Sequence, residues 1–140
     1  SGLGERDHSW GARDWSAPKM WIWLTCQFSD KLALNVTKLT MDAGEVDAGF
    51  VHIDGNNLPL VKADIHTEWQ GDHEPKKLQM ILQDSRGRLH SVQADVMRRM
   101  AIPFAGTNGK TVSTMQETLA RYTMGSEIGY GVAEYLIRAK

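Results

Sequence analysis

The stretch MWIWLTCQFSDKLALNV, residues 20–36, decides the fold class. Side chains in its first half alternate strictly, which is the period-two pattern of a β-strand and not the period of a helix. The two faces are Met20, Ile22, Leu24, Cys26 and Phe28 against Trp21, Trp23, Thr25 and Gln27. Ser29-Asp30 has the composition of a short turn, and the alternation resumes at Leu32. We therefore predict a β-hairpin over this stretch, with large side chains on both faces.

The same pattern of alternation and turns continues to the end of the chain. Turn-forming residues recur at 54–57, 71–75, 84–87 and 124–126, and the sequence between them alternates. One predicted strand face carries Val61, Ala63, Ile65, Thr67 and Trp69, opposite Lys62, Asp64, His66 and Glu68. Later strands are expected over 89–100, 111–122 and 128–138, with a loop from Pro103 to Lys110. The sequence therefore predicts an all-β, antiparallel barrel of about eight or nine strands, with a β-sandwich as the alternative.

Composition fits one globular domain. The chain has 140 residues, of which 41% are hydrophobic and 24% charged, so a core can form without disulfides or metals. A net charge of −1 argues against nucleic-acid binding, and the longest apolar run, Met20 to Leu24, is too short to span a bilayer. Cys26 is the only cysteine, which excludes an internal disulfide and favours the cytoplasm. We expect no metal and no cofactor.

The segment GERDHSWGARDW, residues 4–15, differs from the rest of the chain. It contains two Arg-Asp pairs, Arg6-Asp7 and Arg13-Asp14, and four of the five tryptophans lie between positions 10 and 23. In a structural interpretation, the Arg-Asp pairs pin one end of the barrel and tryptophans cap its core. In a functional interpretation, the segment forms a pocket for an apolar ligand.

The functional interpretation assigns roles to individual residues. Asp7 or Asp14 would donate a proton, since burial raises the pKa of a carboxyl group and a nearby arginine lowers it. His8 would assist, because in an extended segment it shares one face with Trp10 and an aromatic face stabilises positive charge. The predicted catalytic residues are thus Asp7, His8 and Asp14. The predicted ligand-binding residues are Trp10, Trp15, Trp21, Trp23, Arg6, Arg13, Glu117 and Glu134.

Two further sets of polar residues have two interpretations each. Glu117 and Glu134 lie on otherwise apolar strand faces, where a carboxylate is either paired or functional. We favour an internal Glu–Arg pair, with Arg121 as the partner, over catalysis. Asp64, His66 and Glu68 have a metal-ligand spacing, but a solvated outer face explains them more simply.

The stretch Arg6-Asp7-His8-Ser9-Trp10-Gly11-Ala12-Arg13-Asp14-Trp15 resembles the second half of the carotenoid 1,2-hydratase (hydroxyneurosporene synthase) family. Residues 129–135, GYGVAEY, are similar to the closing strand of such proteins. The resemblance implies a lipocalin-like (calycin) barrel, residues 1–140, that forms the C-terminal half of a tandem-barrel protein. It also implies an isoprenoid- or lipid-like ligand. The family's His-x-Trp pair matches His8 and Trp10, whereas Trp21-Ile22-Trp23 stands near where a Tyr-x-Asp pair is expected.

Two functions follow from these observations. The first is an enzyme that protonates an isoprenoid-like alkene, after which hydration or cyclisation occurs. The second is a non-catalytic barrel that carries an apolar ligand or braces a partner, either an N-terminal barrel or a second copy of the chain. A tryptophan-lined cavity reached by a carboxylate would favour the first function.

Overall fold

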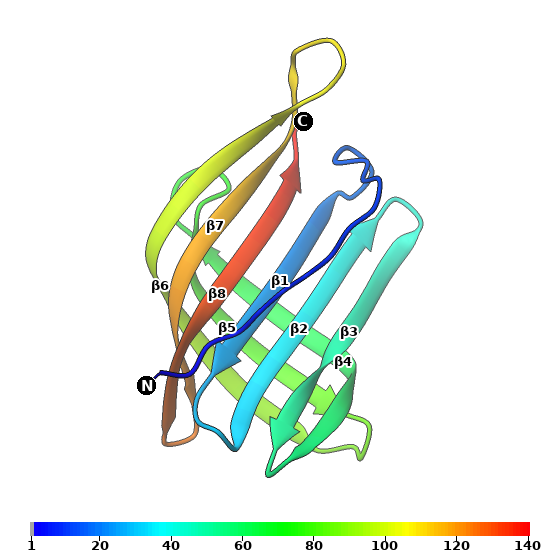
Figure 1. Ribbon diagram of the computed structural model, residues 1–140. Coiled ribbons are helices and arrows are strands. Elements are labelled where there is room, and N and C mark those ends of the chain that lie inside the picture. Colours follow the sequence, from blue (N-terminus) through cyan, green and yellow to red (C-terminus); the bar gives the residue numbers. More distant parts are fainter. Residues whose placement is uncertain (1) are drawn as a thin grey trace.

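The computed structural model describes residues 2–140 and has eight strands (Figure 1). They are β1 (Met20–Gln27), β2 (Leu32–Met41), β3 (Gly44–Ile53), β4 (Asn56–Trp69), β5 (Pro75–Asp84), β6 (Leu89–Ala105), β7 (Thr111–Met124) and β8 (Glu127–Arg138). Each strand pairs antiparallel with the next, and β8 returns to pair with β1. The predicted all-β barrel is confirmed. The described residues include no helix that could cross a membrane.

The barrel interior is filled by side chains from all eight strands. In β1, Ile22, Leu24 and Cys26 point inward and are at most 6% exposed. Two tyrosines are the largest buried side chains: Tyr122 donates a hydrogen bond to the Val132 carbonyl at 2.6 Å, and the Tyr135 hydroxyl lies 2.7 Å from the Thr67 hydroxyl. Burial of these polar tips is therefore compensated.

The predicted apolar face of β4 is wrong at Val61, which is 57% exposed. The pairing of β4 with β5 shifts between Leu60 and Lys62, so one extra residue is inserted. A bulge of this kind reverses the inward and outward positions that follow it. Leu58 and Leu60 therefore point inward before the bulge, and Ala63 after it.

The predicted loop from Pro103 to Lys110 is also wrong in its first part, because β6 continues to Ala105. Pro103 pairs with Thr114 within the β6–β7 ladder. The register of the β6–β7 pairing shifts between Phe104 and Ala105, where the strand ends, and the turn follows after Ala105. The proline does not end the strand, and the extension brings Phe104 to the outer surface of the barrel beside β7.

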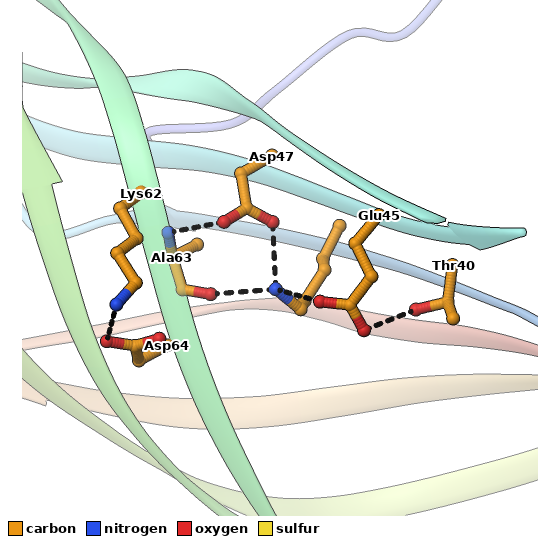
Figure 2. Close-up of polar contacts among 7 residues, drawn as sticks. Thr40, Glu45, Asp47, Lys62, Ala63 and Asp64 are labelled. Atoms are coloured by element: carbon orange, nitrogen blue, oxygen red, sulfur yellow. Dashed lines mark hydrogen bonds and ion pairs between the residues drawn. The ribbon is translucent and has the colours of Figure 1, made fainter. Parts of the chain in front are cut away.

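The barrel is closed by side chains where β3 and β4 separate. Backbone pairing between these strands stops after Phe50 and Pro59. Beyond that point, the Asp47 carboxylate accepts the Ala63 N–H at 2.9 Å, and Lys38 donates to the Ala63 carbonyl at 3.2 Å and to Asp47 at 2.9 Å (Figure 2). The N–H and the carbonyl of Ala63 thereby find hydrogen-bond partners on the side of β4 where no strand pairs with it.

Residues 2–17, which we call the N-terminal strap, form no strand. The strap runs across the outer face of β8, β1 and β2 (Figure 1). Asn35 donates to Glu5 at 3.4 Å, and the Ser113 hydroxyl donates to the Trp15 carbonyl. Among the described residues no ion pair joins Arg6 to Asp7 or Arg13 to Asp14, so these contacts give no support to the structural interpretation of the two Arg-Asp pairs. Arg13 instead donates to Ser9 at 2.5 Å.

Candidate functional site

A cavity of about 420 Å³ lies between the strap and the outer face of the barrel. Trp21 and Trp23 reach it because they alternate with Ile22 and Leu24, which are buried in the interior. The tryptophan cluster therefore faces outward and is covered by the strap. The cavity is lined by Asp7, Ser9, Arg13, Trp15, Trp21, Trp23, Asn35, Thr37, Ile102, Phe104, Met115, Glu117 and Glu134. We call it the acidic chamber.

Aromatic rings form one wall of the acidic chamber. Trp15 stacks on Phe104, with ring centres 4.5 Å apart and planes 12° from parallel. The Arg13 guanidinium carbon lies 5.6 Å from the ring centre of Trp15 and 5.8 Å from that of Trp21. These distances are within the range of cation–π attraction, so the ring faces already hold a positive group.

Two glutamates supply the acid group of the chamber. Burial raises the pKa of Glu134, and together with the negative charge and hydrogen bond of Glu117 and the charge of Asp7 it brings this pKa to about 7. Arg13 opposes these effects. The predicted internal Glu–Arg pair is wrong, since no ion pair joins Glu117 or Glu134 to Arg121 among the described residues. The partner of Glu134 is a second carboxyl group, which adds to burial in favouring the protonated form of Glu134.

The raised pKa of Glu134 predicts a pH-dependent stability. Between the ordinary pKa of 4.5 and about 7, the folded chain keeps a proton that the unfolded chain has lost, so stability falls as pH rises through this window. We expect wild type to lose about 1–2 kcal/mol relative to Glu134→Gln between pH 4.5 and 7.5, after allowance for partial solvent screening. Urea unfolding of both proteins measures the difference. Parallel stability curves would contradict this assignment.

The structure brings together most of the residues singled out in the sequence. Asp7, Arg13, Trp15, Trp21, Trp23, Glu117 and Glu134 all line the acidic chamber. Arg6, His8, Trp10 and Asp14 do not. His8 and Trp10 contact each other, with ring centres 5.0 Å apart, and Trp10 is 83% exposed. Their shared face agrees with the spacing argument.

Asp14 caps a turn of the strap. Its carboxylate accepts hydrogen bonds from the Ser16 hydroxyl at 2.6 Å and the Ser16 N–H at 2.9 Å, and both lower the pKa of Asp14. An acid of this kind is ionised at neutral pH and has no proton to give. The catalytic roles of Asp7, His8 and Asp14 stay predictions.

Sequence reasoning missed several residues of the acidic chamber: Ser9, Asn35, Thr37, Ile102, Phe104 and Met115. Asn35 and Thr37 alternate with the core residues Leu34 and Val36, so the period-two pattern identifies their face. Phe104 was missed because it was predicted to lie in a loop, where alternation assigns no face. Local alternation identifies the outward positions, but it does not indicate which of them the strap covers.

A second cavity of about 340 Å³ adjoins the first and is almost entirely apolar. It is lined by Arg13, Asp14, Trp15, Ala17, Pro18, Trp21, Thr37, Leu39, Met41 and Leu136. Arg13, Trp15, Trp21 and Thr37 line both cavities and stand at their junction. We call this second cavity the apolar chamber.

A larger cavity of about 540 Å³ lies along β4, β5 and β6, away from the strap. It is lined by Lys38, Glu45 and residues 64–66, 79–81 and 91–93. Asp64 and Glu68 form surface ion pairs with Lys62 and Lys76, at 3.1 and 3.3 Å. Residues 2–140 contain no group of three or more potential ligands that could hold a metal ion. Asp64, His66 and Glu68 are all exposed, which agrees with a solvated outer face.

Comparison with known proteins identifies the family. A family model described as "Domain of unknown function (DUF7064)" matches residues 1–139. The chain belongs to the DUF7064 family. The comparison with curated proteins gives no match for this DUF7064 chain.

Among solved structures, the DUF7064 chain is similar to the crystal structure of kievitone hydratase from Nectria haematococca. The identity is 13% and the TM-score 0.58, over 88% of this chain and 40% of that one. The DUF7064 chain thus spans about 40% of the length of that protein. Similarity at this level of identity establishes a shared barrel fold.

Proposed function

We propose that the two chambers bind an apolar isoprenoid- or lipid-like molecule and that Glu134 protonates one of its double bonds, with hydration or cyclisation following. One observation carries this proposal: a carboxyl group that is protonated near neutral pH lies beside aromatic rings in a cavity with an apolar extension. The name of kievitone hydratase, a structural neighbour, supports hydration as the class of reaction.

The proposed hydration uses both glutamates. The Glu134 proton is transferred to one alkene carbon, and the π electrons form the new C–H bond, which leaves a carbocation on the other carbon. Trp23, which lies opposite Glu134, and the ionised carboxylates stabilise that cation. A water molecule then adds through its oxygen and gives a proton to Glu117. Transfer of this proton through the Glu117–Glu134 hydrogen bond restores the starting state. Asp7 contributes negative charge, and in this scheme Glu134 replaces Asp14 as the acid.

Farnesol in heavy water tests the two parts of this proposal. We expect farnesol to bind the wild-type protein, measured by calorimetry, and to gain carbon-bound deuterium, measured by mass spectrometry. Glu134→Gln should bind farnesol within about twofold of wild type, because it keeps the chamber's shape, but should lose deuterium incorporation by about a hundredfold or more. The matched control is Glu127→Gln, an exposed glutamate on the same strand.

Absence of farnesol binding would overturn the proposed ligand class. Binding without incorporation would overturn the acid role of Glu134 and leave the second candidate function, a binding or bracing barrel. A specific observation favours that second candidate. Several large apolar side chains of the outer face are exposed beside the strap: Met100 (61%), Leu119 (46%), Ile128 (47%) and Tyr130 (54%). In this alternative, a preceding barrel of a tandem-barrel protein or a second copy of the chain covers them.

A further inference from the structure

We infer that the joined chambers select amphiphilic organic cations, with an ammonium-type head in the acidic chamber and an alkyl tail in the apolar chamber. This inference rests on the proposed function, because it uses the same cavity and names a ligand that resembles the positively charged stage of the reaction. A ligand of this class would act as an inhibitor and as a probe of the site.

The charge of the acidic chamber argues for a cationic head. Asp7, Glu117 and Glu134 supply three carboxyl groups, and Arg13 supplies the one positive side chain that lines it. The residues from β1, β2 and β6 that line the chamber carry no charge. An anionic head such as a carboxylate or phosphate would therefore meet net repulsion in a partly dehydrated space.

Ring faces provide a second reason. The rings of Trp15 and Trp21 already hold one cationic group, the Arg13 guanidinium, at 5.6 and 5.8 Å from their centres, whereas no cationic side chain of the described residues lies over Trp23. Trp23 also lines the chamber, beside the carboxylates, since it pairs with Glu134 across β1 and β8. Aromatic rings and carboxylates around one cavity are the usual means of holding a quaternary ammonium group.

The apolar chamber determines the rest of the ligand. It meets the acidic chamber at Arg13, Trp15, Trp21 and Thr37, and its remaining wall includes Leu39, Met41 and Leu136. An alkyl chain placed there would remove apolar surface from water on both partners. A head group alone would leave this chamber unfilled, so affinity should depend on tail length as well as on charge.

Three ligands of matched shape test the inference by calorimetry: decyltrimethylammonium, its neutral analogue with a tert-butyl head, and decyl sulfate. We expect the cation to bind at least about tenfold more tightly than the neutral analogue, and the sulfate most weakly. Glu117→Gln should reduce the preference for the cation over the neutral analogue several-fold. Arg13→Gln should increase it, because one positive charge is removed. Glu127→Gln, outside the chamber, should leave it unchanged.

Tail placement has its own test. Leu39→Trp fills part of the apolar chamber, and we expect it to weaken decyltrimethylammonium about tenfold while leaving tetramethylammonium unaffected. Equal affinity for the cation and its neutral analogue would overturn the inference, as would a preference that Glu117→Gln leaves intact. Retained farnesol binding in that case would show that only the cation selectivity had failed. Loss of farnesol binding together with a preserved cation preference would instead refute the proposed ligand class.

Discussion

Gly131→Ala is expected to destabilise the barrel by about 3 kcal/mol or more. Gly131 of β8 lies opposite Cys26 of β1, where the last strand closes on the first. A Cβ atom there would overlap the carbonyl oxygen of Thr25 and lie 2.8 Å from the Cys26 Cα. Both atoms belong to the backbone, so the clash is relieved only when the two strands move apart. Urea unfolding followed by tryptophan fluorescence measures the loss.

Gly4→Ala is the matched control for this prediction. No atom lies within 4 Å of a Cβ built at Gly4, so the same change of side chain should alter stability by less than about 0.5 kcal/mol. Should Gly131→Ala fail to fold, a lower yield of folded protein than for Gly4→Ala supports the same conclusion. A Gly131→Ala protein as stable as wild type would show that β1 and β8 separate at little cost.

Asp84→Ala is expected to lower the melting temperature by about 10 °C. The Asp84 side chain is fully buried at the start of the β5–β6 turn. It accepts the N–H groups of Arg86 at 2.9 Å and Arg88 at 3.1 Å, the Arg88 side chain at 3.1 Å and His90 at 2.9 Å. Alanine removes the acceptor of all four hydrogen bonds, and the largest cost falls on His90, whose side chain is only 10% exposed and has no easy access to water.

The same carboxylate predicts how stability responds to acid. The hydrogen bond from His90, followed by those from the Arg88 and Arg86 N–H groups, holds the pKa of Asp84 below its usual range although burial opposes this. Its stabilisation is therefore complete above the unfolded pKa of about 4 and is lost as pH falls below it. Asp84→Asn should flatten the acid limb of the melting curve. Asp64→Ala, an exposed aspartate paired to Lys62, is the control and should change melting little.

The barrel was predictable because alternation needs only neighbouring residues. Its two errors in strand detail, at Val61 and Pro103, have a common cause. A bulge and a proline inside a ladder depend on the partner strand, so they are set by pairing and not by the local sequence. The turns predicted at 54–57, 84–87 and 124–126 were correctly placed because turn preferences are local, whereas the short turn between Met41 and Gly44 was not predicted.

The site was less predictable than the fold. Alternation groups Trp21 with Trp23 and Ile22 with Leu24, but both sets are large and apolar, so hydrophobicity alone leaves the inward set undecided. Apolar residues occur on this part of the outer face because the strap covers them. Glu117 and Glu134 were recognised as unusual, yet their partner was misassigned, because contacts across strands depend on a register that one sequence does not contain.

The side-chain closure between β3 and β4 has a consequence for how the family can diversify. Elsewhere, backbone hydrogen bonds hold the barrel shut, and any substitution other than proline leaves their donors and acceptors in place. At Ala63, closure depends instead on the identities of Asp47 and Lys38. A relative with other residues at these two positions would have a slit in its wall while the neighbouring ladders stayed intact. We therefore expect point substitutions at these two positions to change the width of the opening while the fold stays the same.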